Sequence, residues 1–343
     1  MTVILALDAM GGDRSPDIVI EGASLAIAQN HKAFGDLFFN LYGDEVVLKA
    51  LVSKYPNLSG FVQIHHAEEV VTNDTKPSAA IRGLRRSSMR LAIESVVEGV
   101  SHAVVSAGNT GAYMALSKIL LKTLDGIDRP AIAATLPTMK GTTVALDLGA
   151  NLECTVENLI QFAVMGDVVA RRILHKKNPK LGLLNVGSEE MKGSAIVQQA
   201  AQIIRDVGQL NYIGFVEGDD ITGGDVDVIV TDGFTGNVAL KTIEGVAHFI
   251  MGAVKDAMAS SWRGKVAYAV AQPVFAALKT RLDPRLYNGA IFIGLREVAV
   301  KSHGGADGFA FANAIRVAAD LAVRIESQNL AQEIEEKLKD YGE

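Results

Sequence analysis

The sequence predicts an α/β fold, with helices covering a doubly wound, mostly parallel sheet. Short apolar runs of strand type alternate with helical patterns along almost all of the 343 residues. Six of these runs end directly in a glycine-rich or polar turn, which is typical of strands that lead into helices in such a sheet. No linker, repeat or proline-rich boundary interrupts the pattern, so we expect one domain over residues 1–343.

The elements follow in order from the amino terminus. Val3–Leu7 is aliphatic and predicts the first strand. Ser15 and Pro16 then predict the start of a helix through about Gln29, with Ser15 as a cap and Pro16 in the first turn. Helices are expected between the remaining strands, which are predicted at 38–42, 62–65, 103–106, 131–136, 143–148, 181–186, 212–216, 226–231 and once or twice within 290–302.

The helical pattern continues from about residue 236 to 287 without a strand candidate. We therefore expect a helical extension over 240–287, divided by Pro273. Its apolar residues recur every four positions beside several basic residues; they are Trp262, Val266, Val270, Val274 and Leu278. A stripe of this kind is typical of a core or a dimer contact. A basic amphipathic hairpin also suits reversible adsorption to an anionic membrane surface, so both interpretations stay open.

Composition and charge exclude several classes of protein. A net charge of −6 gives no basic face for nucleic acid. The single cysteine, Cys154, excludes a disulfide framework and a cysteine-rich metal site. The first residues lack the basic region of a signal peptide, and no apolar stretch reaches the roughly 18 residues of a membrane span. We expect a cytoplasmic protein.

The six turns carry the strongest functional signal. They are Asp8–Asp13, Ser106–Gly111, Asp147–Asn151, Asn185–Glu189, Thr231–Asn237 and Ser302–Asp307. The carboxyl ends of parallel strands share one edge of a sheet, so we expect the turns to converge on one crevice. Glycine lets backbone N–H groups approach a phosphate, which favours an anionic substrate. Any single turn could be an ordinary loop, and the Rossmann and Walker A patterns are absent.

Read as motifs, these turns closely resemble the PlsX family. The matching segments occur in family order: Asp8-Ala-Met-Gly-Gly-Asp13, Ser106-Ala-Gly-Asn-Thr-Gly111, Gly126-Ile-Asp-Arg-Pro-Ala131, Asp147-Leu-Gly-Ala-Asn151, Gly182-Leu-Leu-Asn-Val-Gly187 and Val230-Thr-Asp-Gly-Phe-Thr-Gly-Asn-Val238. The resemblance runs from Ile4 to the helix after Asp307. It implies a fold similar to those of phosphotransacetylases and isocitrate-type dehydrogenases.

The resemblance also implies an activity and a set of partners. PlsX proteins are the phosphate acyltransferases of bacterial phospholipid synthesis, and they transfer a long acyl chain from acyl carrier protein to inorganic phosphate. The implied protein is a homodimer at the inner face of the membrane, where a glycerol-3-phosphate acyltransferase consumes the acyl phosphate. Two alternatives stay open: a short-chain phosphotransacetylase that uses coenzyme A, and a non-catalytic membrane-associated scaffold.

This chemistry needs little acid or base assistance. Phosphate is largely dianionic near neutrality, with a second pKa of about 6, and the leaving thiol has a pKa of about 8.5. The protein must mainly position the phosphate and donate hydrogen bonds to the oxyanion, so we expect no cofactor and no metal. The expected catalytic residues are Asn109, Asn185, Lys192, Asp232, Asn237, Lys241 and His303. The expected phosphate-binding residues are Asp8, Gly11, Gly12, Gly108, Thr110, Gly111, Gly233, Thr235 and Gly236.

Two further features bear on partners and on a covalent mechanism. Four arginines crowd one segment without an intervening acid: Arg82, Arg85, Arg86 and Arg90. They could form a solvated helix face or a docking site for the acidic acyl carrier protein, and we give these two interpretations equal weight. Cys154 lies beside Glu153 and Glu157, which oppose thiolate formation, so we expect a structural cysteine.

Overall fold

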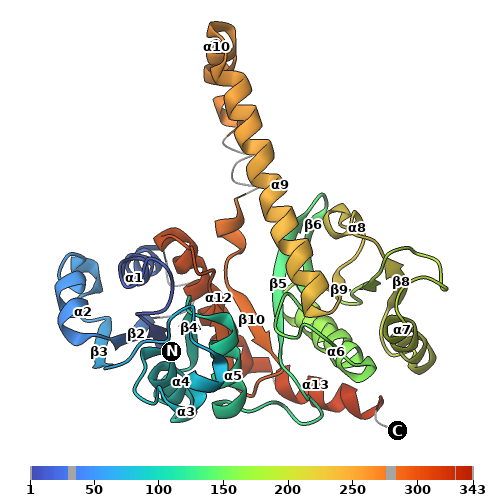
Figure 1. The fold of residues 1–343 in the computed structure, drawn as a ribbon, viewed down its shortest axis with the longest axis horizontal. Coiled ribbons are helices and arrows are strands. Elements are labelled where there is room, and N and C mark those ends of the chain that lie inside the picture. Colours follow the sequence, from blue (N-terminus) through green and yellow to red (C-terminus); the bar gives the residue numbers. More distant parts are fainter. Residues whose placement is uncertain (1, 30–35, 276–282, 329, 342–343) are drawn as a thin grey trace.

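The computed structural model describes the whole chain except residues 1, 30–35, 276–282, 329 and 342–343. Eleven strands form one sheet in the order β3-β2-β1-β4-β11-β10-β5-β6-β9-β7-β8. Helices pack on it in the body of the molecule, and one long helix projects from it (Figure 1). Seven of the ten neighbouring strand pairs are parallel, which confirms the predicted α/β class with a mostly parallel sheet.

Every predicted strand is present, with ends displaced by a few residues. The strands are β1 (Thr2–Asp8), β2 (Asp36–Gly43), β3 (Val62–His66), β4 (Ala103–Ser106), β5 (Ala131–Thr138), β6 (Gly141–Leu146), β7 (Leu181–Leu184), β8 (Tyr212–Val216), β9 (Val228–Val230), β10 (Ala290–Ile293) and β11 (Val298–Lys301). The 290–302 segment, where one or two strands were expected, contains two.

The helices fill the intervals as predicted. They are α1 (Asp17–Gln29), α2 (Glu45–Val52), α3 (Pro77–Arg82), α4 (Ser88–Val97), α5 (Thr110–Leu120), α6 (Val156–Arg172), α7 (Ala195–Val207), α8 (Asp220–Gly223), α9 (Gly233–Ala259), α10 (Trp262–Val270), α12 (Gly308–Gln328) and α13 (Leu330–Lys339). At the start of α1 the N–H groups of Ile18 and Val19 donate to the carbonyl oxygens of Arg14 and Pro16, and the hydroxyl of Ser15, the expected cap, donates to the carbonyl oxygen of Gly11.

Strand direction corrects the expectation of a single crevice. β10 is antiparallel to both β11 and β5, and β5 is antiparallel to β6. Three reversals therefore separate β11 from β6, so that β6, β9, β7 and β8 run opposite to β1, β2, β3, β4 and β11. The premise that all strand ends share one edge is wrong, and the glycine-rich turns fall into two sets, one for each parallel half of the sheet.

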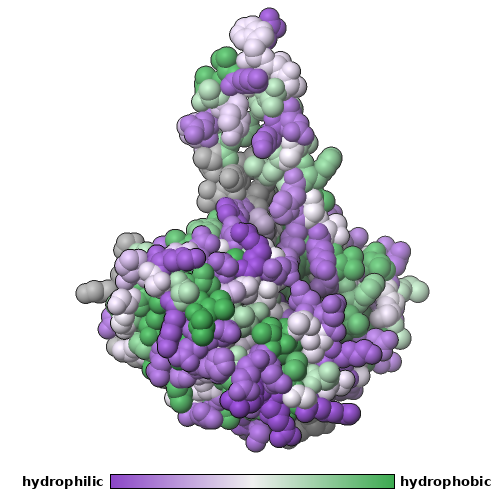
Figure 2. Space-filling view, turned by 60° about the vertical axis from the view of Figure 1, so that its left-hand side comes forward, coloured by the Kyte–Doolittle hydropathy of each residue, from purple (hydrophilic) through white to green (hydrophobic). Residues whose placement is uncertain are grey.

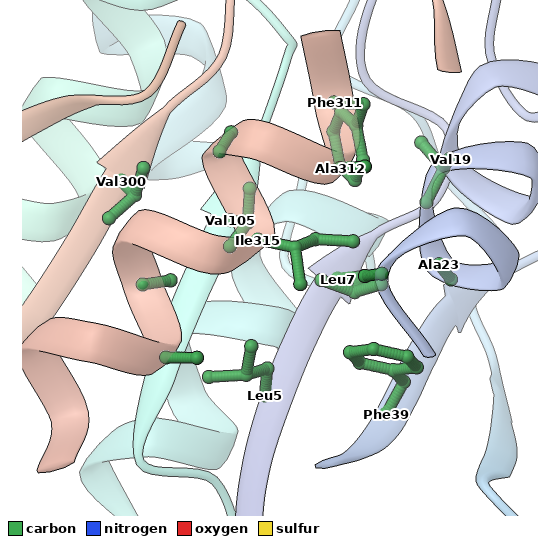
Figure 3. Close-up of a cluster of buried hydrophobic side chains, with 14 of the residues drawn as sticks. Leu5, Leu7, Val19, Ala23, Phe39, Val105, Val300, Phe311, Ala312 and Ile315 are labelled. Atoms are coloured by element: carbon green, nitrogen blue, oxygen red, sulfur yellow. The ribbon is translucent and has the colours of Figure 1, made fainter. Parts of the chain in front are cut away.

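The first half of the sheet has a core on each face. Leu5, Leu7 and Phe39 point toward α1 and α12, where they meet Val19 and Phe311 (Figure 3). The intervening residues of the same strands point to the other face, beneath α4 and α5. This alternation of two apolar faces is what a strand buried on both sides requires, and it fixes the register of every residue that follows at the strand ends.

The second half has its own core, and α9 leaves the body beside it. Leu146 of β6, Val228 of β9 and Phe162 of α6 are all buried in this core. Only the first turn of α9 is buried, at Gly233 and Gly236. The rest of α9 carries α10 to the tip of a projecting hairpin (Figure 1). The helix of α10 ends at Val270, and residues 272–275 are again helical.

Candidate functional site

The carboxylate of Asp8 organises the turn after β1. It is buried and accepts hydrogen bonds of 2.6 Å from the hydroxyls of Ser88 and Ser106. Burial raises the pKa of the Asp8 carboxyl, while these two hydrogen bonds oppose the shift. Because the bonds join α4, β4 and β1, Asp8 acts by holding the turns in place.

Packing accounts for three of the expected phosphate-binding glycines. A Cβ on Gly11 would lie 2.3 Å from Oδ2 of Asp8, and one on Gly108 would lie 2.7 Å from Cε of Met89. Gly12 has a φ of +113°, which an L side chain rarely adopts. Gly11 and Gly12 are therefore needed to build the turn whether or not a phosphate binds to them, whereas the Met89 atom beside Gly108 is the far end of a flexible side chain that can shift.

Asn109 uses its side chain to hold two segments together. Its Oδ1 accepts from the backbone N–H of Ala112 and so caps α5. Its Nδ2 donates to backbone carbonyls in the loop 72–75, including that of Asn73 at 2.7 Å. The next residues, Thr110 and Gly111, form the first turn of α5 beside this capped end.

A second group of residues surrounds Asp147 in the other half of the sheet. This carboxylate is fully buried and accepts five hydrogen bonds, from the backbone N–H groups of Ile132, Gly149, Ala150 and Asn151 and from Nδ2 of Asn151. Burial raises the pKa of the Asp147 carboxyl, and the donors oppose the shift. The loop after β6 is thus wound around a single side chain.

The first turn of α9 packs on this loop. A Cβ on Gly236 would lie 1.9 Å from the carbonyl oxygen of Asp147, and one on Gly233 would lie 2.6 Å from that of Asn151. The N–H of Gly236 donates to the carbonyl oxygen of Asp232. This N–H is therefore already bonded within the helix, and the Gly236 position is filled by the packing of α9 on the Asp147 loop.

The polar residues around Gly236 also bond within this group. The Asp232 carboxylate caps α9 by accepting from both the N–H and the hydroxyl of Thr235. Nδ2 of Asn237 donates to the carbonyl oxygen of Leu148, at 3.2 Å. Asn237 and the N–H of Gly233, which donates to the carbonyl oxygen of Asn151 at 2.7 Å, therefore hold α9 on the Asp147 loop, while Asp232 and Thr235 cap the helix.

The remaining expected catalytic residues lie at separate places. Nδ2 of Asn185 donates to the carbonyl oxygen of Lys192, within the loop between β7 and α7, and the Lys192 side chain is exposed. Lys241 is exposed on α9. His303 follows β11, where its N–H donates to Asn288 and its Nδ1 accepts from the N–H of Gly305. Hydrogen bonds thus divide the expected site into three groups, and His303 lies with the Asp8 group.

Sequence reasoning missed Lys301, the last residue of β11. Its side chain is only 8% exposed, and Nζ donates to the carbonyl oxygens of Ala107 and Ser302. Burial lowers the pKa of the Lys301 ammonium to about 8. The available signal was a lysine that ends the apolar run Val298–Val300 directly before one of the six turns.

The arginine segment is less basic than its sequence indicates. Arg86 pairs with Glu68 at 3.1 Å and Arg90 pairs with Glu94 at 2.7 Å. Within the described part of the chain, Arg82 and Arg85 form no ion pair and are exposed. The patch that could meet an acidic partner is therefore centred on these two side chains.

Cys154 has the environment expected of a structural cysteine. Burial raises the pKa of its thiol to about 11, and the Asp147 carboxylate adds to the shift. At neutral pH the thiol stays protonated, which argues against an acyl-enzyme intermediate. Among the residues that the structure describes, no group of three metal-ligating side chains is positioned to hold an ion. Those residues also contain no helix long and apolar enough to cross a membrane.

Comparison with known proteins shows the family. A model of fatty acid synthesis proteins matches residues 3–328. The chain is 51% identical to the phosphate acyltransferase of Rhodospirillum centenum over 331 residues, covering 96% of this chain and 92% of that protein. It is 48% identical to that of Paramagnetospirillum magneticum over 334 residues, covering 97% and 94%.

Among solved structures, a phosphotransacetylase from Streptococcus pyogenes has the same fold. The two chains have a TM-score of 0.61 at 16% identity, over 94% of each chain. The branched-chain phosphotransacylase of Enterococcus faecalis gives 0.57 at 14% identity, over 93% of this chain and 99% of that one. The relatives at about half identity, the family model and the ordered motifs agree, and this chain belongs to the PlsX family of fatty acid synthesis proteins.

Proposed function

We propose that this enzyme transfers a long-chain acyl group from acyl carrier protein to inorganic phosphate, giving acyl phosphate for glycerolipid synthesis. The observation that carries the proposal is the near full-length identity of 48–51% with phosphate acyltransferases. In the reaction, a phosphate oxygen bonds to the thioester carbon, the C–S bond breaks, and the carrier thiolate leaves with the electron pair. No step needs a cofactor or an acyl-enzyme.

The two sets of glycine-rich turns, one for each parallel half of the sheet, are proposed to have different roles. The end of α5 is capped by Asn109 and presents Thr110 and Gly111 at the positive end of an 11-residue helix, which favours an anion. Asp8 holds this end in place. The Asp232, Thr235 and Asn237 group acts by positioning α9, while Asn185, Lys192, Lys241 and His303 are proposed to contact the substrates.

A product assay tests the proposed function. Purified enzyme should form acyl phosphate from palmitoyl acyl carrier protein and phosphate, and release one carrier thiol for each product. Preference for acetyl coenzyme A would favour the short-chain phosphotransacetylase instead. Binding of acyl carrier protein without turnover would favour the non-catalytic scaffold.

We further propose that acyl carrier protein docks beside Arg82 and Arg85. The two guanidinium groups stand at the end of α3 and just after it, close in sequence to the loop 72–75 that Asn109 holds against α5. A positive patch at this place attracts an acidic carrier from a protein that is negative overall.

Reversing both charges should raise the apparent KM for acyl carrier protein. In the variant Arg82→Glu with Arg85→Glu, we expect an increase of about tenfold at low salt, shrinking as salt rises, with the KM for phosphate unchanged. The matched control is Lys177→Glu with Lys180→Glu, an equal change in charge at two exposed lysines before β7. Equal effects of the two double variants would show that Arg82 and Arg85 belong to an ordinary solvated surface and have no specific role in docking.

The exposed tip of the hairpin is the proposed contact with an anionic membrane surface. Trp262, Val266, Val270 and Val274 are 72%, 55%, 79% and 68% exposed. Arg263 stacks over the Trp262 ring at 5.5 Å. Figure 2 shows hydrophobic and hydrophilic side chains mixed on this projection. Leu278, the last residue of the expected stripe, lies outside the described residues.

Charged residues at the tip should abolish membrane adsorption. Each buried valine contributes at most about 1.5 to 3 kcal/mol and each basic residue about 1 kcal/mol near an anionic surface. Val270→Asp with Val274→Asp should therefore move the enzyme from the pellet to the supernatant when sedimented with phosphatidylglycerol vesicles. Acyl transfer from soluble carrier protein and the oligomeric state should persist. Loss of activity together with dissociation would instead place these valines in a subunit contact.

We also propose a homodimer that covers α9. This helix exposes an apolar stripe with helical spacing, made of Phe234, Val238, Val246, Phe249 and Ile250. The stripe covers residues 234–250 of this 27-residue helix, which is about 25 Å along the helix axis, and an apolar stripe of that length suits packing against a second copy of the chain.

A further inference from the structure

Three polar side chains stand side by side at the carboxyl ends of β1, β4 and β11. Lys301 is paired with Ser106 in the register of β11 and β4. Asp8 directly follows the last pair of β1 and β4 and accepts a hydrogen bond from Ser106. The residues two positions earlier on each strand lie in the apolar core beneath α4 and α5. Because side chains alternate along a strand, the three polar residues end that same face.

The Lys301 ammonium is buried without a carboxylate bonded to it. Among the described residues its hydrogen bonds go to two backbone carbonyls, those of Ala107 and Ser302, and an ammonium has three donors. These carbonyls belong to the turn that leads into α5 and the turn that follows β11. The ammonium therefore lies between the two turns, among the residues that the structure describes.

The charged and titratable groups around Lys301 are engaged elsewhere. Asp8 on β1 is bonded to the Ser88 and Ser106 hydroxyls, and the exposed Asp13 accepts from Nδ2 of Asn73. On α5, the hydroxyl of Tyr113 donates to carbonyls of β4 and β11. The neighbouring His303 bonds to Gly305 and Asn288. A buried ammonium without an ion-pair partner is costly to the fold, so an apolar residue would serve stability better.

The turn beside the ammonium is more open than its neighbours. A Cβ on Gly304 would make only ordinary contacts, at 3.7 Å from the carbonyl oxygen of Ala107 and from Asp13, and one on Gly305 would come no closer than 3.5 Å to another residue. Neither glycine has the positive φ that requires glycine. The fold thus accepts a side chain at both positions, in contrast to Gly11 and Gly108, and glycine leaves the backbone bare beside Lys301.

We propose that Lys301 is a phosphate-binding residue of the acyl transfer site, and that the dianion lies between the turn of Gly108 and the turn of Gly304. This inference rests on the proposed function and deepens it. The bound phosphate supplies a negative charge to an ammonium that has no carboxylate bonded to it among the described residues. The phosphate is held where α5 begins, and the positive charge reduces repulsion between the dianion and the oxyanion that forms on the thioester.

The proton affinity of Lys301 supports this role. Burial lowers the pKa of the ammonium to about 8, and the negative charges of Asp8 and Asp13 raise it. A bound phosphate dianion adds negative charge beside the ammonium and should raise the pKa again. At pH 8, binding of phosphate should therefore be accompanied by proton uptake.

Phosphate binding to the variant Lys301→Met tests the inference. Methionine keeps the length of the chain without the charge. We expect the dissociation constant and the KM for phosphate to rise at least about tenfold, the KM for the acyl donor to stay unchanged, and the melting temperature to stay equal or rise. Calorimetry in two buffers of different ionisation enthalpy should show proton uptake at pH 8 in the wild type only. Lys54→Met, at an exposed lysine, is the control.

A second measurement needs no variant. Acetic anhydride labels neutral lysines, and peptide mass spectrometry reads each site; inorganic phosphate should slow the labelling of Lys301 and leave that of Lys54 unchanged. If the wild-type enzyme forms no acyl phosphate, the proposed function is wrong. If the wild type forms acyl phosphate while Lys301→Met binds phosphate normally, or while phosphate does not protect Lys301, the inference alone is overturned.

Discussion

Replacing Gly236 by valine should unfold the base of α9 and cost at least about 3 kcal/mol of stability. A Cβ at this position would lie 1.9 Å from the carbonyl oxygen of Asp147 and 2.9 Å from Cγ2 of Thr231. The first of these atoms is backbone in a loop held by five hydrogen bonds to the Asp147 carboxylate, so it cannot move away cheaply. Urea denaturation followed by circular dichroism measures the loss.

The same helix supplies the matched control. Gly245 is exposed, and a Cβ there meets nothing within 4 Å. Gly245→Ala should stabilise the protein by roughly 0.5–1 kcal/mol, because alanine is the better helix former. If Gly236→Val is as stable as the wild type but inactive, the glycine serves substrate binding and the packing argument fails.

The structure gives the glycine residues of these turns a second role beside the one predicted from the sequence. Glycine-rich turns at strand ends predicted an enzyme that binds an anion, and the family they identify is the right one. Gly11, Gly108, Gly233 and Gly236 were interpreted as contacts to phosphate. Each also has a protein atom less than 3 Å from its missing Cβ, so packing gives a second reason for glycine at these positions. A sequence shows that a turn lacks side chains, but the atom that occupies the space can come from a distant strand or helix.

The fold was predictable wherever the signal is local. Periodicity located all the strands, since each is an apolar run bounded by turn residues. Strand direction was not predicted. β10 is antiparallel to both of its neighbours, so β5 runs in the same direction as β11. The hairpin between β5 and β6, which turns between Thr138 and Gly141, then reverses the second half of the sheet and separates the turns into two sets.

Lys301 and Asp147 show the same limit for single residues. Lys301 was passed over because lysine is ordinarily exposed, and only the neighbouring strands bury it to 8% exposure. Asp147 was recognised as part of a turn, but its hydrogen bonds reach Ile132 on the adjacent strand. In both cases the chemistry of the residue depends on its neighbours on adjacent strands. The order of the strands in the sheet cannot be read from the sequence, so these neighbours could not be predicted.

Removal of the Asp147 carboxylate should be among the most destabilising single changes in this chain. Asp147→Ala leaves five N–H donors around a buried space, and unpaired buried donors cost about 1–3 kcal/mol each before the loop relaxes. Because water can enter and satisfy some of them, we expect a net loss of roughly 3–5 kcal/mol in the free energy of unfolding. Asp147→Asn should lose less, since one carbonyl oxygen remains as an acceptor.

The half-buried Asp232 provides the comparison that isolates this effect. It also accepts hydrogen bonds at the base of α9, but from one backbone N–H and one hydroxyl of Thr235, and both donors are exposed. Asp232→Ala should therefore cost only about 1 kcal/mol, as the loss of an ordinary helix cap does. Because α9 sits on the Asp147 loop and carries the hairpin proposed to contact the membrane, Asp147→Ala should also weaken vesicle binding, whereas Asp232→Ala should not. Equal unfolding free energies for the two alanine variants would show that burial of the Asp147 carboxylate contributes nothing specific to the fold.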